Sequence, residues 1–553
     1  MNDFRPYRTP QRLAGGSFDG VVRTGNRPAA RKPSAQVRTH NQQSTLEGFR
    51  RREGFNGLST MQLRTSSAAA VRQDPVGEIP RQPKADLPGG PSRVATAHKP
   101  RHKKRKLATR FMSVIVFGVI VLGGVLAGKG YIAVNSVFRG GGDAPALAED
   151  VDPATLSGEG DGRVNILMLG KGSEGHDGAD LTDTILVASI DPINKKASIL
   201  SIPRDLWVKN PAGGHSKINA VYAATKSKHL NADSSPEQIE EASREGISAL
   251  EGTIEETMGI PIHYYTVLDF IAFQQAINTV GGVDLTISPD DAAGIVRETL
   301  WDELTGENYT LDVQPGENHF DGQRALMYAR SRHASARGDF DRTERQRKII
   351  LALKDKVLSA GTYGNPVKIS QLMNDFGSHM TSNLGLREVL RIYELGSAID
   401  TATINSVGLA DPPNVLVRTD MIDGQSVVRP MAGLSDYSEI QSFVRNTLKD
   451  GYLQKESADI AVYNGTNING LAGQRADDLR SYGYGITTVA NAPGGGDYGS
   501  TILVDLTAGE KKYTRHYLEN RLGVTAVDSL PDGVTETSGA DFVIILGQNE
   551  ANR

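Results

Sequence analysis

The 553-residue sequence contains no cysteine. A disulfide framework, a thiol nucleophile and a thiolate metal site are therefore excluded. The chain also lacks a Walker-type phosphate-binding sequence, so nothing in it indicates a nucleoside triphosphate as energy source. The absence of cysteine fits an exported protein but does not establish export by itself.

Acidic residues are scarce at the N-terminus. Residues 1–110 hold 23 Lys and Arg against 7 Asp and Glu, although the whole chain has a net charge of only −4. This stretch is rich in Arg, Gly, Pro, Ser and Gln, a composition that buries too little surface to offset chain entropy. We expect a disordered basic tail over 1–110 that attracts anionic lipid. The tail has few aromatics and no recognisable DNA-binding fold, so nucleic acid is a disfavoured partner.

One long apolar run follows the tail. The sequence FMSVIVFGVIVLGGVLAG at 111–128 carries no charge over 18 residues. With the residues after it, the run is long enough to cross roughly 30 Å of hydrocarbon, which predicts a single transmembrane helix over 111–135. The basic cluster at 102–106 lies on its N-terminal side only, which predicts a cytoplasmic N-terminus and an extracytoplasmic remainder in the cell membrane. The alternatives are a buried core helix and a cleaved signal peptide with a small-residue site at Ala144–Ala148.

A mixed α/β pattern begins after a Gly-, Asp-, Ala- and Pro-rich linker at 136–162. From Val164 the apolar runs VNILMLG, TILVASI and ASILSIP predict buried strands, and the sequence DPIN predicts a turn between the second and third. Such strands, combined with the amphipathic helices that follow, indicate an α/β domain.

Two helices are predicted after these strands. Ser235 as N-cap, Pro236 at the first position and Gly259 at the end predict a helix with six residues on one face: Ile239, Ala242, Ile247, Leu250, Ile254 and Met258. A second apolar helix is predicted over 267–280, before Gly281-Gly282. Each is either a plain core helix or a wall of a cleft that accepts a hydrocarbon chain.

The strongest chemical signal is the string FDGQRALMYARSRHASARGDFDRTERQRKII at 320–350. Between residues 330 and 348 it holds seven Lys and Arg and one His, in a part of the chain that is otherwise acidic. A solvated basic helix is the simplest interpretation of such a composition. Arginine predominates over lysine, however, and Asp339 and Asp341 lie among the arginines. Because the planar guanidinium binds phosphate oxygens bidentately, a convergent set suits a pyrophosphate.

Two shorter motifs add to this signal. The sequence SIPRDLWV at 201–208 places Arg204 and Asp205 at a strand end, and Lys217 and Asn219 follow the Gly-rich loop PAGGHSK. Each motif is weak alone.

Taken together, the motifs resemble the LytR-CpsA-Psr family over about residues 163–410. The order and spacing match in Thr182-Asp183-Thr184, the turn DPINKK, SIPRD at 201–205, KINA at 217–220, GGV at 281–283 and the string at 320–347. The sequences DIAVYNGTNINGLAGQRADDLRSYGYGI, STILVDL and DFVIILG are similar to the smaller α/β C-terminal domain often joined to that family, over about 457–548. Residues 411–456 fit either a linker or extra helices.

The resemblance implies an extracytoplasmic phosphotransferase. Such enzymes attach a glycopolymer carried on a polyprenyl pyrophosphate to peptidoglycan through a phosphodiester, usually with Mg²⁺. By position, the catalytic group would comprise Arg204, Arg330, Arg332, Arg342, Gln346 and Asp339. Asp183 would bind the metal, and the remaining substrate contacts would come from Lys217, Asn219, Arg345 and Asp205. The alternative is a non-catalytic envelope assembly factor that binds polyprenyl phosphates through the same arginines.

Two positions depart from the family pattern. In the family, an acidic residue commonly follows the first strand, but this chain has Lys171 there. An arginine commonly precedes the Asp-Thr pair, but this chain has Leu181 before Thr182. Either His176, Asp177 or Asp180 replaces the acid, or Lys171 supplies positive charge at the metal position.

Overall fold

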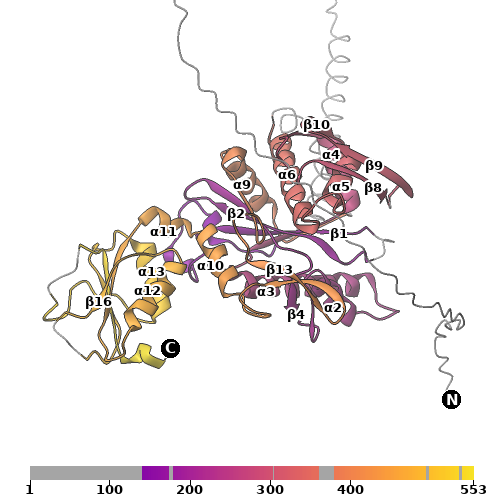
Figure 1. The fold of residues 1–553 in the computed structure, drawn as a ribbon. Helices are drawn as coiled ribbons and strands as arrows, with labels where there is room; N and C mark the ends of the chain where they lie inside the picture. Colours follow the sequence, from indigo (N-terminus) through magenta and orange to yellow (C-terminus); the bar gives the residue numbers. More distant parts are fainter. Residues whose placement is uncertain are drawn as a thin grey trace, which may run out of the picture. The chain divides into compact units, whose positions relative to one another are not determined.

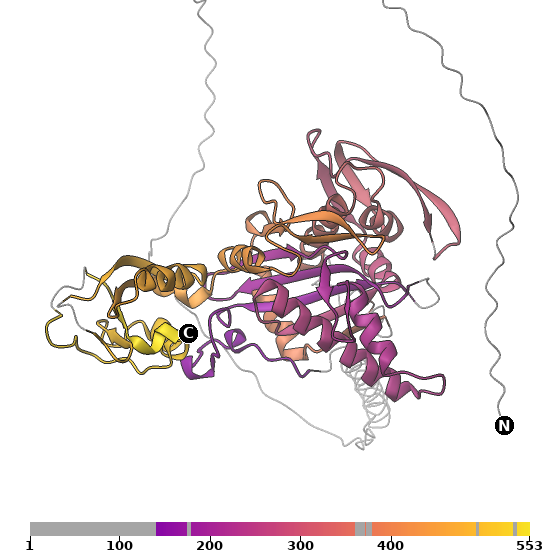
Figure 2. The ribbon, with the colours of Figure 1, turned by 60° about the horizontal axis from the view of Figure 1, so that its bottom comes forward.

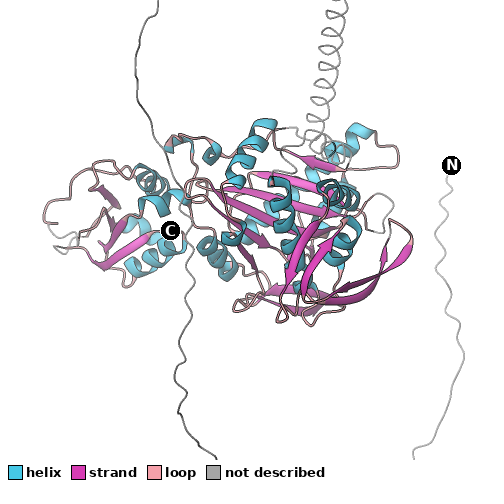
Figure 3. Ribbon diagram, turned by 90° about the horizontal axis from the view of Figure 1, so that it is seen from above, coloured by secondary structure: helices cyan, strands magenta, loops and turns pink. Residues whose placement is uncertain are grey.

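A computed structural model describes residues 140–173, 178–302, 304–359, 371, 379–493, 497–534 and 539–552. The predicted basic tail at 1–110 and transmembrane helix at 111–135 lie outside these ranges. Within them, no helix combines the length and the apolar character needed to cross a bilayer. The predicted mixed α/β architecture is confirmed, because strands run through the interior with helices on both sides of them (Figure 3).

A six-stranded mixed sheet forms the centre of the larger domain, in the order β11-β6-β1-β2-β3-β12. β1 pairs antiparallel with β2 and parallel with β6, and β2 pairs antiparallel with β3. The three predicted strands correspond to β1–β3. The bounds are β1 Val164–Lys171, β2 Thr182–Asp191, β3 Lys196–Ser201, β6 Tyr264–Asp269, β11 Met380–Ser382 and β12 Asn405–Gly408.

The two faces of this sheet carry different cores. Leu167 and Leu169 of β1 pack with α3 (Pro236–Met258), whereas Val164 and Ile166 pack with α9 (Leu386–Ser397) on the other face, as the alternation of strand side chains requires. Figure 1 shows α3 and α9 on opposite sides of the strands, and Figure 2 shows the purple helices α2 (Ala220–Lys228) and α3 along one side.

Helix α3 begins and ends where the sequence predicted. Ser235 and Gln238 form a capping box, and Gly259 adopts the left-handed conformation at the C-cap. Five of the six residues predicted on its apolar face are buried, but Ile239 is 43% exposed because it lies in the first turn, before the helix reaches the core.

The second predicted helix starts three residues later than expected. α4 spans Phe270–Val280, because residues 264–269 pair with β1 as β6 and the Asp269 carboxylate accepts a hydrogen bond from the Ala272 amide. A side-chain cap of this kind fixes where a helix begins.

Three helices next to the central sheet carry a further core; among them, α4 contacts β6 and α6 (Asp339–Leu358) contacts β3 and β12. Helices α5 (Gly322–Arg330) and α6 pack with α4 and with two hairpin-like sheets around one apolar cluster. The strands are β7 Val283–Ile287 with β10 Gly316–Phe320, and β8 Val296–Asp302 with β9 Glu307–Val313.

Residues 411–456 contain regular structure. They hold β13 Val417–Ile422, β14 Gln425–Pro430, α10 Ser438–Thr447 and α11 Gly451–Glu456, and Ile440 and Val444 of α10 join the same core as α3.

The C-terminal domain has a four-stranded sheet in the order β16-β15-β18-β17. Its elements are β15 Asp459–Asn464, α12 Leu471–Ser481, β16 Gly485–Asn491, β17 Ile502–Asp505, α13 Lys512–Leu522 and β18 Phe542–Leu546.

The chain before β1 contributes to the C-terminal core. Val151 and Leu156 are buried in the same apolar cluster as Tyr517 of α13. The buried carboxylate of Asp450 accepts hydrogen bonds from the amides of Gly160 and Gly162, at 3.0 and 2.9 Å. Residues 151–162 therefore pack against the C-terminal domain before the chain continues into β1.

Candidate active site

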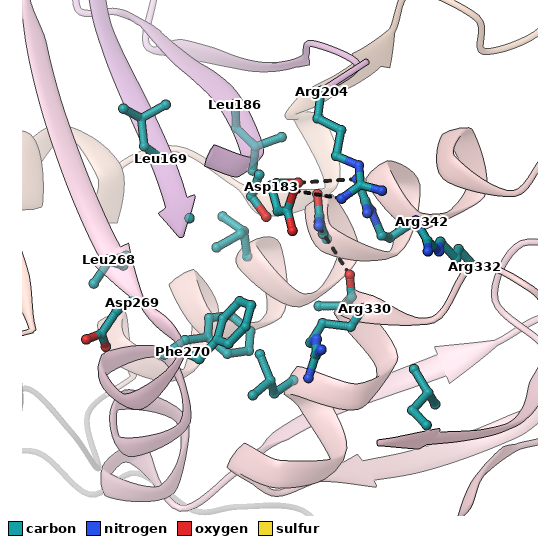
Figure 4. Close-up of a pocket in the computed structure, with 18 of the residues that line it drawn as sticks. Leu169, Asp183, Leu186, Arg204, Leu268, Asp269, Phe270, Arg330, Arg332 and Arg342 are labelled. Carbon is teal, nitrogen blue, oxygen red and sulfur yellow. Dashed lines mark hydrogen bonds and ion pairs between the residues drawn. The ribbon is translucent and has the colours of Figure 1, made fainter. Parts of the chain in front are cut away.

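A cavity of about 450 Å³ opens at the end of β1, the start of β2 and the connection between α5 and α6. One part of its wall is polar and the other apolar. The polar part contains Asp183, Arg204, Arg330, Arg332, Arg342 and Gln346, and the apolar part contains Leu169, Leu186, Leu268, Phe270, Phe273, Leu326 and Ile350. Figure 4 shows Asp183, Arg204 and Arg342 close together, with Leu268 and Phe270 on another side of the cavity.

A β-bulge places Asp183 in this cavity. Gly170 pairs with Thr184 and Lys171 with Thr182, so Asp183 is the extra residue of β2. Bulges redirect a side chain and are common beside active sites. Gly170 is needed opposite the bulge, because a Cβ atom there would lie 2.9 Å from Cβ of Thr184.

Asp183 forms the centre of a charge network. Its Oδ1 atom accepts hydrogen bonds from Arg204 at 2.6 Å and from the Asn219 amide at 3.4 Å. Burial alone would raise the pKa of this carboxyl, but Arg204, and then Arg342, hold it below its ordinary value. Asp183 is therefore ionised at neutral pH.

Arg342 is the most deeply buried of the cavity cations. Burial lowers its pKa to about 10, opposed by the neighbouring carboxylate of Asp339, whose Oδ2 atom accepts a hydrogen bond from Arg342 at 2.9 Å. Burial would also lower the pKa of Arg204, but Asp183 and Asp339 raise it above its ordinary value. Both guanidiniums remain charged at neutral pH.

Three buried polar atoms of this site have no hydrogen-bond partner: Nε of Arg204, Nε of Arg342 and Oε1 of Gln346. A buried polar atom without a partner costs free energy, so native proteins rarely retain one without a reason. Nε of Arg204 lies 3.6 Å from Oδ1 of Asp339, whereas Nε of Arg342 is a donor that an oxygen of an anionic ligand could satisfy.

Arg330 reaches the cavity from the last turn of α5, and Arg332 from the chain that joins α5 to α6. The guanidinium of Arg330 lies 5.0 Å from the ring centre of Phe270, at the border of the apolar wall. Glu298 of β8 accepts hydrogen bonds from the Ser331 hydroxyl and from the Arg332 amide, the latter at 3.2 Å. Glu298 also lines the cavity, and sequence analysis did not identify it, because its motif carries no recognisable spacing.

Three other predicted site residues do not line the cavity: Asp205, Lys217 and Asp339. Asp205 pairs with Lys217 at 2.8 Å beside Arg204, so these two reach the network but do not line the cavity. Asp339 joins it through Arg204 and Arg342.

Arg345 is placed differently from the other predicted arginines. It is fully buried and donates to the backbone oxygens of Tyr328, Ala293 and Ser331. Its charged group is therefore used to hold the α5–α6 connection and does not line the cavity. Similarly, α3 does not contribute to the cavity wall, whereas α4 contributes Phe270 and Phe273.

The two residues that depart from the family pattern, Lys171 and Leu181, do not line the cavity. Lys171 and Lys226 contact the two carboxylate oxygens of Asp180 at 3.2 and 2.8 Å. Burial would raise the pKa of Asp180, but the two lysines lower it. His176 and Asp177 lie outside the described residues.

A model described as the LytR_cpsA_psr family matches residues 138–433, more than half of the chain. The chain belongs to the LytR-CpsA-Psr family. A second model, described as LytR cell envelope-related transcriptional attenuator, matches residues 457–549, so both sequence-based resemblances are confirmed.

Curated relatives agree with the family assignment. The cell wall biosynthesis protein LcpA of Corynebacterium glutamicum is 27% identical over 83% of this chain and 91% of its own length. The polyisoprenyl-teichoic acid–peptidoglycan teichoic acid transferase TagV of Bacillus subtilis is 29% identical over 56% of this chain and 74% of its own. A crystal structure of B. subtilis TagV is similar over 52% of this chain and 96% of that one, with 27% identity and a TM-score of 0.39.

Proposed function

We propose that this protein is a cell-wall ligase that transfers a glycopolymer from a polyprenyl pyrophosphate to peptidoglycan. The observation that carries the proposal is a single cavity with converging arginines at one part of its wall and leucine and phenylalanine side chains at another. A donor with an anionic pyrophosphate and a hydrocarbon tail requires this combination. TagV, a relative in the same family, is named as a transferase of this class.

The chemistry is phosphoryl transfer without a covalent enzyme intermediate. A hydroxyl oxygen of the acceptor attacks the phosphorus that carries the glycopolymer, and the bond from this phosphorus to the bridging oxygen breaks. Polyprenyl phosphate leaves with that bond's electrons, and the hydroxyl proton passes to water. Arg204, Arg342 and Arg332 neutralise charge on the phosphate oxygens, and the leaving group supplies the energy.

We further propose that magnesium assists this transfer. Mg²⁺ usually takes one or two carboxylates together with substrate phosphates rather than a cage made only of protein. Asp183 fits this requirement because it is ionised, lines the cavity and is 31% exposed at its side chain. No group of three or more acidic, His or Cys side chains that could hold a metal occurs among the residues described. When bound, the ion would neutralise charge on the donor phosphates.

The proposed location is the outer face of the cell membrane. The apolar run at 111–128 and the basic cluster before it support a single anchor with its N-terminus in the cytoplasm. This anchor would bring the cavity near a donor that is embedded in the same membrane.

The test is transfer by the purified full-length chain in nanodiscs. A synthetic short-chain polyprenyl-pyrophosphate oligosaccharide and peptidoglycan fragments serve as substrates, with Mg²⁺ or with EDTA. Arg332→Ala should abolish transfer, because this exposed arginine lines the cavity without supporting the core. Arg418→Ala, at a 50% exposed side chain in β13, is the matched control and should remain active. Donor binding without transfer to any acceptor would instead support a non-catalytic binding factor.

A further inference from the structure

The surface of α9 carries an apolar pair at one end only. Leu386 and Leu390 are 45% and 60% exposed, and because they are four residues apart they share one face of the helix. The opposite face, with Val389, Ile392 and Leu395, packs into the core. Together they form a small apolar patch that the described residues leave exposed.

Charged side chains also lie around this pair. Arg391, directly after Leu390, pairs with Glu394 at 2.7 Å and lies 3.8 Å from Glu149. The two leucines lie in the first half of the helix, with exposed Arg387 and half-buried Glu388 between them.

The chain enters the described domain at this same end of α9. The amide of Gly140 donates to the Leu384 oxygen and the amide of Gly142 to the Asn383 oxygen, each at 3.2 Å. The proposed membrane anchor ends near residue 135, and five extended residues span at most about 18 Å. The polar headgroup region of a bilayer is itself several ångströms deep, so the first turns of α9 are held within reach of it.

We propose that Leu386 and Leu390 insert into the headgroup region of the membrane that anchors the chain, with Arg387 beside the lipid phosphates. Amphipathic helices bind at the interface in this way, with leucines at the acyl boundary and basic side chains at the headgroups. The contact would fix the orientation of the domain on the bilayer, beyond the tethering that the anchor provides. The inference rests on the proposed anchor, but it does not require transferase activity.

The absence of cysteine makes a direct test possible. Leu390→Cys in the full-length chain would carry the only thiol, which is labelled with bimane after reconstitution into vesicles of phosphatidylcholine and phosphatidylglycerol. Brominated lipids should quench this label strongly. The control is Glu241→Cys, an exposed position on α3, on the opposite face of the central sheet, which should be quenched little.

Three results would overturn the inference. Equal weak quenching at both positions would show that α9 does not touch lipid. Failure of the chain to float with vesicles would contradict the proposed membrane anchor as well as the contact of α9 with lipid. Lipid-independent protection of the label that depends on protein concentration would show that a second copy covers the leucines.

A functional measurement separates this contact from the enzymatic proposal. Leu386→Glu/Leu390→Glu should lower transfer from a bilayer-embedded long-chain donor several-fold and leave transfer from a water-soluble short-chain donor unchanged. Equal loss with both donors would contradict an orienting role. Quenching of the label in a chain that transfers from neither donor would reject the proposed function and leave the membrane contact intact.

Discussion

Asp183 is the residue on which two arginines and an asparagine converge. Its ionised carboxylate balances Arg204 and Arg342, and its place in a bulge directs it into the cavity. We predict that Asp183→Asn lowers the transfer rate on the order of 100-fold, because the amide cannot replace an anionic ligand in a phosphoryl-transfer site. The measurement is transfer rate against Mg²⁺ concentration, with Asp420→Asn in β13 as control. Full activity with unchanged Mg²⁺ dependence would contradict the proposal that Asp183 binds magnesium.

Glu251 provides a pH-dependent prediction away from the site. Burial in α3, with a contribution from Glu255, raises its pKa to about 7. A carboxyl with a raised pKa destabilises the fold when it ionises, so stability falls as pH rises from about 4.5 to about 7. Glu251→Gln should therefore stabilise the protein at pH 8 by up to about 3 kcal/mol and change little at pH 4. Thermal unfolding at the two pH values measures this, and equal effects at both would contradict it.

The arginines show what the sequence alone could and could not predict. Four arginines of the family motifs line one cavity: Arg204, Arg330, Arg332 and Arg342. Arg345 has the same charge and the same motif, yet its donors are taken by backbone oxygens. Only the path of the α5–α6 connection decides between these two uses of a guanidinium, and no local pattern in the sequence encodes it.

At the scale of elements, the connection from α5 to α6 depends on a strand that precedes it. Glu298 of β8 holds Ser331 and Arg332. We predict that Glu298→Ala raises KM for the pyrophosphate donor about tenfold with a smaller change in kcat, because Arg332 loses its fixed backbone. Glu298→Gln should restore most of the affinity, since its amide oxygen still accepts hydrogen bonds. Steady-state kinetics with both variants measures this, and a loss in kcat alone would contradict it.

The ends of a helix could be predicted from the sequence where capping residues mark them. The capping box of α3 and Gly259 are visible in the sequence, and both ends were predicted correctly. The start of α4 was missed because the apolar run VLDF serves first as a strand and then as a helix. Pairing with β1 decides the boundary, and this pairing is a tertiary contact that periodicity does not reveal.

For the whole molecule, the stability of the C-terminal domain depends on residues that precede the larger domain. Leu156 is 2% exposed within the C-terminal core. Leu156→Ala should lower the free energy of unfolding of that domain by about 2–5 kcal/mol, through lost burial and the cavity left behind. Calorimetry of the full chain measures it, with Leu434→Ala, at a 47% exposed position, as control. An equal effect of both substitutions would show that the contact is unimportant.

The packing of Val151 and Leu156 against the C-terminal domain could not be predicted from the sequence. The composition of residues 136–162 is typical of a linker, and nothing in it indicates that Val151 and Leu156 have partners in α13. The sequence therefore predicted the two α/β units and their order, but not the contact of Val151 and Leu156 with α13.

The shared core has a consequence for how the chain is made. Synthesis proceeds from the N-terminus, so Val151, Leu156 and the Gly160 amide emerge long before Asp450 and α13 exist to receive them. Until then Val151 and Leu156 lack the side chains that bury them. A chain cut short after α10 would leave both apolar side chains without their partners in the C-terminal core.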